Sequence, residues 1–295
     1  MGRRQAVRQR VLVPPFLGSN PSGPVPSAHR CGLQQLPLLV FDFDGVLVDG
    51  MEEYWWSARR AALELERQGP GTIPPLCLPN EIPPAFRQLR PLIHKGWEMV
   101  LMAAELGRPD GSLETLLEAY PQALANAQAS WGQSSGALQA LLEAVRREAL
   151  STDRQGWLDR HHMYPGVRER LHRLEKEGAP WAVLTTKGEA FTAELLAAAG
   201  LRPVALYGHE AGNKTEVLEK LLQEQPGSEG PLRPLWFVED RRPTLELVRQ
   251  SAGLDSVRCL LASWGYLAPD DHKGLEELGI QWLTPELFQA PLAEW

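Results

Sequence analysis

The 295-residue sequence predicts an α/β fold: a Rossmann-like core with a parallel sheet, interrupted by an inserted all-helical domain. Two observations lead to this fold class. Residues 161–295 alternate short apolar runs with helical stretches, which is typical of a parallel sheet covered by helices on both faces. Residues 51–160 show helical periodicity and contain no apolar run that resembles a strand as well as those after residue 161 do. A strand-like run precedes this helical block, so the block is expected to interrupt the sheet domain.

The core begins with the apolar run 38–43, which is expected to form a buried strand. Because this run finds no partner strand before residue 161, the core is expected to be discontinuous, comprising residues 37–50 and 161–295. The other expected strands are 181–186, 203–208, 235–240, 258–263 and 280–283. The expected helices are 165–178, 189–200, 214–224 and 243–253, with Pro165 and Pro243 in first turns and Gly178, Gly200 and Gly253 as C-caps.

The insertion, residues 51–160, is expected to form a helical cap domain. One helical face carries Trp97, Val100, Leu101 and Ala104 at spacings of three and four residues. A second helix repeats this pattern from Leu138 to Val145. The Pro-rich stretch 69–84 is expected to be a loop between elements.

The bulk composition restricts partners and location. A net charge of −7 argues against binding to nucleic acid or to anionic membrane surfaces. No apolar run approaches the roughly 18 residues that span a bilayer. Three widely spaced cysteines favour a reducing compartment, and hence a cytoplasmic protein. Residues 1–36 are expected to be a disordered extension. Five arginines and no acidic residue in 1–35 leave organelle targeting open.

Chemically useful side chains follow the strands at one edge of the predicted sheet. Ligands of open parallel sheets bind outside the carboxyl ends of the strands. Asp42 and Asp44 follow the first strand, and their i, i+2 spacing points both side chains the same way in an extended chain. The residues expected at the other strand and helix ends are Thr185, Thr186, Lys187, Lys214, Glu239 and Asp240. Oxygen-only ligands with few carboxylates suit Mg²⁺, so a magnesium site is expected here.

The same residues carry a family resemblance. In order along the chain, "DFDGVLVD", "VLTTK", Lys214 and "FVEDRRPT" resemble the four motifs of the haloacid dehalogenase-like hydrolases. The segments "YPGV" (164–167) and "ASWGY" (262–266) are similar to those of the phosphoglycolate-phosphatase-like branch. An insertion directly after the first motif resembles the helical C1 cap of that family.

The resemblance implies a role for each motif. Asp42 is implied to attack phosphorus and form an aspartyl-phosphate, and Asp44 to act as general acid and base. Thr185 and Lys214 are implied to hold the phosphoryl oxygens. The implied substrate-binding residues are Thr185, Thr186, Lys187 and Lys214. The implied metal ligands are Asp42, Asp44 through its main-chain carbonyl, Asp240 and Glu239.

The fourth motif departs from the family pattern of paired aspartates. It reads Glu239-Asp240, with Thr244 where a later acid could stand. Asp240 is the first choice as a metal ligand. Glu239 could coordinate directly, coordinate through water, only orient Lys214, or be a plain surface carboxylate.

The predicted function is a Mg²⁺-dependent phosphatase that hydrolyses a small phosphorylated metabolite. A homodimer is an open alternative. A phosphomutase or a phosphonatase also fits, whereas Asp44 disfavours a dehalogenase. A P-loop-like nucleotide-binding module is a rival because "GHEAGNKT" departs from that motif only at Asn213. A catalytically silent regulatory module is a further rival.

Three other segments allow two interpretations each. The adjacent pair His161-His162 is expected at a surface or an interface, not at a metal site, because no carboxylate cluster surrounds it. The segment 53–56 either lines the substrate pocket or packs at the cap hinge. Arg90, His94 and Lys95 are candidates for binding an anionic tail of the substrate, or they are solvated charges.

Overall fold

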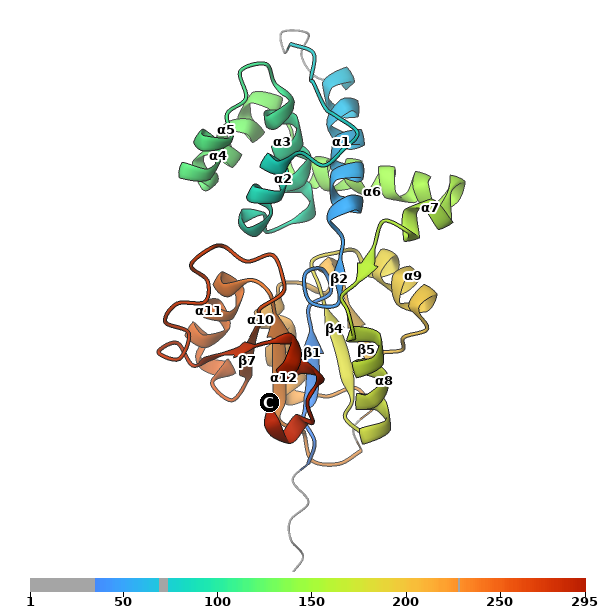
Figure 1. The fold of residues 1–295 in the computed structure, drawn as a ribbon, viewed down its shortest axis with the longest axis vertical. Coiled ribbons are helices and arrows are strands. Elements are labelled where there is room, and N and C mark those ends of the chain that lie inside the picture. Colours follow the sequence, from blue (N-terminus) through green and yellow to red (C-terminus); the bar gives the residue numbers. More distant parts are fainter. Residues whose placement is uncertain (1–34, 69–73, 228) are drawn as a thin grey trace, which may run out of the picture. The chain divides into compact units, whose positions relative to one another are not determined.

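The computed structural model describes residues 35–68, 74–227 and 229–295, and the fold is drawn in Figure 1. The predicted disorder of the N-terminal extension concerns residues outside these ranges, apart from 35 and 36. Within the described residues, no helix combines the length and the apolar character needed to cross a membrane.

The core is a six-stranded sheet with the order β5-β4-β1-β6-β7-β8, in which every neighbouring pair is parallel. The first strand therefore lies at the centre, between β4 and β6. Its partners come from beyond residue 161, as predicted, because Val40 is in register with Ala182 on one side and Phe237 on the other. The strands are β1 (Leu38–Phe41), β4 (Trp181–Leu184), β5 (Ala205–Tyr207), β6 (Leu235–Glu239), β7 (Arg258–Ala262) and β8 (Ile280–Leu283).

Helices cover both faces of this sheet, which confirms the predicted α/β class. Alternate residues of β1 enter separate apolar clusters: Leu39 and Phe41 belong to one, and Leu38 and Val40 to the other. This is the period-two alternation of a strand buried on both faces. The core helices are α8 (Val167–Glu177), α9 (Glu189–Ala199), α10 (Lys214–Gln223), α11 (Arg242–Gln250) and α12 (Pro285–Gln289).

In the described residues between β2 and β3, all regular elements are helices, and they have an apolar cluster of their own. We call this segment the helical cap; the boundaries predicted for it, 51 and 160, stay a prediction. Leu101 and Leu138 are among the buried residues, in agreement with the helical faces read from the sequence. Its α-helices are α1 (Met51–Gln68), α2 (Pro84–Leu89), α3 (Gly96–Gly107), α4 (Leu113–Glu118), α5 (Tyr120–Trp131), α6 (Ser135–Thr152) and α7 (Arg154–Leu158).

A small antiparallel ribbon joins the helical cap to the core. It consists of β2 (Val48–Asp49) and β3 (His162–Met163), with Val48 opposite Met163. Both crossings of the chain between cap and core therefore lie side by side. We call this pair the hinge ribbon. The sequence did not predict it because two-residue strands are too short to show a period.

Several predicted boundaries were wrong by a few residues. The first strand ends at Phe41 and β4 at Leu184, so the reactive side chains stand in the turns after the strands. Pro165 precedes α8. The helix begins at Val167, directly after Gly166, whose backbone is in the left-handed conformation (φ 75°). Gly253 is not a C-cap. Helix α11 ends at Gln250, where the hydroxyl of Ser251 donates a hydrogen bond to the carbonyl of Leu247.

Candidate active site

The turn after β1 carries Asp42 and Asp44, and both side chains are buried, with residue exposures of 6% and 7%. The Asp42 N–H donates to the Val238 carbonyl at 2.9 Å, so β6 continues to hold the chain beyond the strand. Gly45 then turns it with a φ of 94°. A Cβ at this position would lie 1.9 Å from Asp240 Oδ2. Glycine is therefore required both by the backbone conformation and by the close approach of Asp240.

Three carboxylates from two neighbouring strand ends meet beside this turn. Asp42, Glu239 and Asp240 each place an oxygen within 4.8 Å of the others, and all three are buried. We call them the acid cluster. Lys214 is the cation paired with it: its Nζ lies 2.9 Å from Asp42 Oδ1 and 2.6 Å from Glu239 Oε2. Sequence reasoning had placed all four residues at one edge of the sheet, and the structure brings them together.

The position of Lys214 follows from the start of α10. Asn213 is the N-cap of this helix and accepts a hydrogen bond from the Glu216 N–H, while the Glu216 side chain accepts one from the Asn213 N–H. This reciprocal capping box stabilises the first turn of the helix. Lys214 is the first residue of that turn, so its side chain is delivered from a well-defined backbone.

The acid cluster holds more negative charge than its surroundings compensate. Burial, and after it the charge of Glu239, raises the pKa of Asp42 to about 6. Burial also raises the pKa of Asp240 to about 6, and it raises the pKa of Glu239 as well. Burial alone would lower the pKa of Lys214, but Asp42 and Glu239 outweigh it and raise that pKa. Lys214 forms ion pairs with two of the three carboxylates, and Arg90 acts on Asp240 only through its charge, so a further cation would stabilise the ionised cluster.

The acid cluster fits a magnesium ion. Within the described part of the chain, the buried Oδ1 of Asp240 has no hydrogen-bond partner, whereas its Oδ2 accepts the N–H of Tyr266 at 2.9 Å. A buried carboxylate oxygen without a donor is costly, and a cation would satisfy it. Oxygen donors at this spacing are the ligands that Mg²⁺ prefers.

Asp44 faces a different partner from Asp42. Its carboxylate is not part of the acid cluster, and its Oδ1 lies 3.5 Å from Lys187 Nζ. The phenol of Tyr54 is a second neighbour of Asp44. Burial, and after it the negative charge of Asp44, raises the pKa of that phenol. That the Asp44 carbonyl binds the metal stays a prediction.

The turn after β4 presents the second predicted motif. Thr185 is 3% exposed; its N–H donates to the Tyr207 carbonyl and its Oγ1 accepts the Lys187 N–H at 3.1 Å. Thr186 is exposed, and Lys187 is buried at the base of the cap. All three residues follow a strand that pairs directly with β1, so this turn borders the one that carries Asp42 and Asp44.

Sequence reasoning missed a second buried cluster beside Lys187. Glu53, in the first turn of α1, is fully buried and binds Arg146 through two hydrogen bonds of 2.7 and 2.8 Å. Lys187 Nζ lies 3.4 Å from the same carboxylate. Burial would raise the pKa of Glu53, but Arg146 and then Lys187 hold it well below its usual value. We call Glu53, Arg146, Lys187 and His161 the Glu53 cluster.

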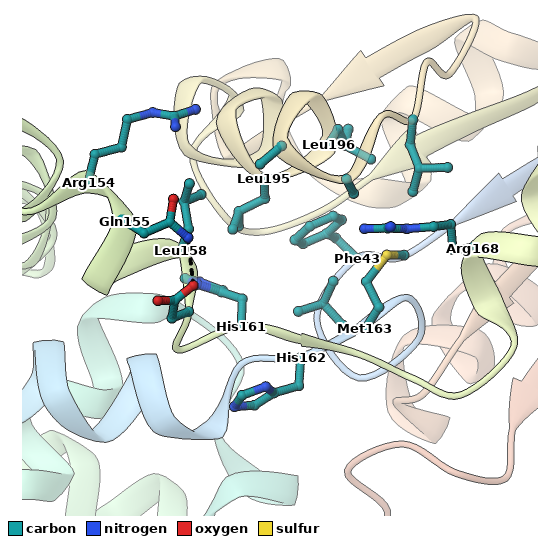
Figure 2. A pocket seen from close by; sticks show the side chains of 15 residues that line it. Phe43, Arg154, Gln155, Leu158, His161, His162, Met163, Arg168, Leu195 and Leu196 are labelled. Carbon is teal, nitrogen blue, oxygen red and sulfur yellow. Dashed lines mark hydrogen bonds between the residues drawn. The ribbon is translucent and has the colours of Figure 1, made fainter.

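The prediction for His161 was wrong. Its side chain is only 2% exposed, and its Nε2 lies 3.8 Å from Glu53 Oε2. The reason is tertiary: helix α7 covers it, with the Trp157 ring centroid 4.5 Å away. His162 is exposed, as predicted, and Figure 2 shows the two rings on opposite sides of the chain. Within residues 53–56, Tyr54 lines a cavity beside Asp44 and Trp55 packs in the apolar cluster of the cap; that this cavity binds the substrate stays a prediction.

The segment "ASWGY" also supports the site in a way that its composition did not reveal. The Tyr266 hydroxyl donates to Asp49 Oδ1 at 2.6 Å and accepts the Gly50 N–H at 2.8 Å, and so ties the segment to the hinge ribbon. A Cβ on Gly265 would lie 2.2 Å from the Cβ of Asp240. The segment therefore packs directly against the acid cluster, and glycine is required there for space.

Two cavities differ in their relation to these residues. A small one of about 20 Å³ lies between core and cap, lined by Asp44, Tyr54, Arg90, Lys95, Thr186 and Lys187 among others. We call it the cap cavity. A larger one of about 510 Å³ lies beside the hinge ribbon and α9, with Phe43 and Leu195 in its wall (Figure 2). None of the predicted catalytic residues lines the larger cavity.

The predicted candidates for an anionic tail do not behave alike. Arg90 and Lys95 line the cap cavity as cations. His94 also lines it, but its Nδ1 faces the Arg241 guanidinium at 2.8 Å. Since a guanidinium can only donate, this nitrogen accepts and the imidazole is not a free cation.

The fold and the order of the motifs are those of a known family. A family model described as haloacid dehalogenase-like hydrolase matches residues 36–242, which is most of the chain. The protein belongs to the haloacid dehalogenase-like hydrolases.

Curated relatives place the chain near one branch. A phosphoglycolate phosphatase of Pseudomonas syringae pv. tomato is 36% identical over 102 residues, which are 32% of this chain and 36% of that protein. A phosphoglycolate phosphatase of Pseudomonas syringae pv. syringae is 30% identical over 175 residues, or 56% and 61% of the two chains. The matched parts thus span about a third to three fifths of these relatives.

Solved structures share the fold. A predicted phosphatase from Clostridium acetobutylicum is similar with a TM-score of 0.53 and 13% identity, covering 87% of this chain and 98% of that one. A haloacid dehalogenase-like family protein from Streptococcus pneumoniae has a TM-score of 0.51 and 16% identity, with 85% and 94% covered. At these identities the likeness concerns the fold alone.

Proposed function

We propose that this protein is a Mg²⁺-dependent phosphatase that hydrolyses a small phosphomonoester through an aspartyl-phosphate on Asp42. The observation that carries the proposal is the arrangement of Asp42, which is buried, lies within 4.8 Å of two further carboxylates and faces Lys214. A carboxylate held in this way can act as a nucleophile once cations neutralise its surroundings. The name of the curated relatives makes phosphoglycolate the first substrate to test.

The residues divide the reaction between them. An Asp42 oxygen bonds to phosphorus while the ester bond to the leaving oxygen breaks, and Asp44 gives that oxygen its proton. Water then attacks the phosphorus, Asp44 takes up its proton, and Asp42 is released with inorganic phosphate. Lys214 and the hydroxyl of Thr185 stabilise the charge on the phosphoryl oxygens. Bound Mg²⁺ would supply positive charge to the phosphoryl group and to the acid cluster.

We infer different duties for the two acids of the fourth motif. Asp240 has an oxygen free of hydrogen bonds in the described structure, so it suits direct coordination together with Asp42. Both oxygens of Glu239 are engaged, one by Lys214 Nζ at 2.6 Å and the other by the Arg241 N–H at 3.2 Å. Of the predicted alternatives for Glu239, orienting Lys214 is therefore the one that we favour.

The rival functions have less support. The side chain of Asn213 caps α10, and Lys214 is held by Asp42 and Glu239, so this segment is not arranged as a loop that wraps nucleotide phosphates. A phosphomutase or phosphonatase stays an alternative that cap residues would decide. A homodimer and a cytoplasmic location stay predictions.

A screen of small phosphomonoesters tests the proposal. We expect the wild type to release phosphate only with Mg²⁺, and Asp42→Asn to lose about 10⁴-fold or more in kcat with its fold retained, because the nucleophile is gone. Circular dichroism would check the fold. Full activity of Asp42→Asn would reject Asp42 as the nucleophile, and activity undiminished by EDTA would reject the metal.

A further inference from the structure

A buried guanidinium in the cap lacks an anionic partner. Arg90 is 7% exposed, and its Nη1 donates one long hydrogen bond, 3.3 Å, to the Ile93 carbonyl. Its buried Nε has no hydrogen-bond partner in the described part of the chain. The guanidinium carbon lies 4.2 Å from the Tyr266 ring centroid and 5.0 Å from that of Tyr54. These aromatic faces and a hydrogen bond to the side chain of Tyr54 stabilise the cation, but the Nε donor is left without a partner.

An unpaired buried charge is costly. Transfer of a guanidinium out of water is compensated when a carboxylate or phosphate accepts its hydrogen bonds. In the described residues no side-chain carboxylate forms an ion pair with Arg90, although Asp240 is close enough to influence it electrostatically. The missing partner is therefore expected from outside the chain.

The other cations around the cap cavity are already neutralised or lie on its exposed side. Arg146 and Lys187 both face Glu53, and Lys187 also lies 3.5 Å from Asp44. Lys95 is exposed and marks the outer side of the cavity. Arg90 is thus the buried cation in this wall with donors to offer.

The cavity also lies where the leaving group of a substrate would stand. Asp44, the proposed acid for the leaving oxygen, lines it together with Arg90. Whatever is bonded to that oxygen therefore extends toward Arg90. The cavity has room for about 20 Å³, little more than one water-sized centre, so the group that reaches Arg90 is small.

On the basis of the proposed function, we propose that Arg90 binds a carboxylate on the leaving group, and that the substrates are phosphate esters of small hydroxy acids. A carboxylate is planar and accepts two parallel hydrogen bonds from a guanidinium. Arg90 is therefore a specificity-determining residue, distinct from those that act on phosphorus.

A matched pair of substrates tests the inference. 2-Phosphoglycolate and ethyl phosphate are alike at the ester oxygen, but the second has a methyl group in place of the carboxylate. We expect wild-type kcat/KM to favour 2-phosphoglycolate by about 10²-fold or more. Arg90→Gln should lower kcat/KM for 2-phosphoglycolate by about 10²–10³-fold, mainly through KM, and that for ethyl phosphate by less than about tenfold.

Two control variants distinguish a lost contact from a general defect. Arg90→Lys keeps the charge but not the planar fork, and should recover only part of the preference. Arg87→Gln removes an exposed arginine of α2 and should leave both substrates unaffected. Equal losses of Arg90→Gln on both substrates, or a wild type that does not discriminate between them, would overturn the inference.

A binding measurement makes the result independent of turnover. Calorimetry on Asp42→Asn should detect binding of 2-phosphoglycolate at least about tenfold tighter than ethyl phosphate, and adding Arg90→Gln should abolish the difference. If no phosphomonoester is hydrolysed by the wild type, the proposed function fails while this binding result still decides the role of Arg90. If esters are hydrolysed but binding ignores the carboxylate, the role of Arg90 fails alone.

Discussion

The acid cluster and the Glu53 cluster both bury carboxylates close to the junction of core and cap, yet their electrostatics are opposite. In the acid cluster, Lys214 pairs with Asp42 and Glu239 but not with Asp240, and burial raises the pKa of Asp42 and of Asp240 to about 6. In the Glu53 cluster, one carboxylate faces Arg146 and Lys187, and its pKa is held well below the usual value. The ratio of cations to carboxylates decides the difference, since burial is similar.

This contrast separates a site that needs a ligand from one that is complete. The acid cluster is stabilised by whatever adds positive charge, which is what a metal-assisted reaction on phosphate requires. The Glu53 cluster already satisfies its carboxylate, and it links α1 and α6 of the cap to the turn after β4. We regard the second cluster as a structural connection that holds Lys187 beside Asp44.

The largest expected effect on stability comes from breaking the complete cluster. Glu53→Gln leaves Arg146 buried without its anion, which should lower the free energy of unfolding by about 3–5 kcal/mol. Urea unfolding followed by circular dichroism would measure it. The matched control is Glu52→Gln, an exposed neighbour, which should change stability by less than about 0.5 kcal/mol. Equal effects of the two substitutions would contradict the structural role of Glu53.

The incomplete cluster should respond in the opposite direction. At about 100 times its dissociation constant, Mg²⁺ should stabilise the wild type by about 2.7 kcal/mol, and thermal unfolding with and without the ion would measure the shift. Asp240→Asn should abolish that shift and, without Mg²⁺, be as stable as the wild type or more so, because it removes a carboxylate whose charge burial disfavours more than its neighbours stabilise it. The exposed control Asp270→Asn should keep the shift. A full Mg²⁺ shift in Asp240→Asn would place the ion elsewhere.

A smaller effect should appear in the pH dependence of stability. Burial, and then the charge of Lys187, lowers the pKa of His161 from 6.5 to about 4, although Glu53 opposes the shift. Between pH 6.5 and about pH 4, His161 is protonated in the unfolded chain but not in the folded one. Its contribution to the free energy of unfolding is therefore complete above pH 6.5 and decreases as the pH falls. Between pH 6.5 and about pH 5 the loss should be about 1.5 kcal/mol.

Urea unfolding at several pH values would measure this loss, and His161→Gln should remove this part of the dependence, while His94, whose pKa is also lowered to about 4, keeps its own share. The adjacent exposed control, His162→Gln, should leave the slope as it is in the wild type. A slope that His161→Gln does not alter would mean that His161 already accepts a proton in the fold.

Much of the core and of the acid cluster could be predicted from the sequence. Asp42 and Asp240 follow apolar runs whose length and composition identify buried strands, and parallel strands bring such ends to one edge. Lys214 was recognised through the order of the motifs. Glu53 was missed because its partner Arg146 is 93 residues away, and nothing in the local pattern of α1 marks a glutamate as buried. The hinge ribbon was missed because its strands are only two residues long.

The order of apolar and polar residues by itself determined the parallel sheet, the helical insertion and the edge at which the acidic side chains gather, because these depend on neighbours within a few positions. Only the tertiary structure decided which charges are compensated: Lys187 meets Glu53 across 134 positions, Asp240 keeps an oxygen without a donor, and Arg90 lies between two tyrosine rings without an anion. Charge compensation acts through space between distant segments, so no local period records it.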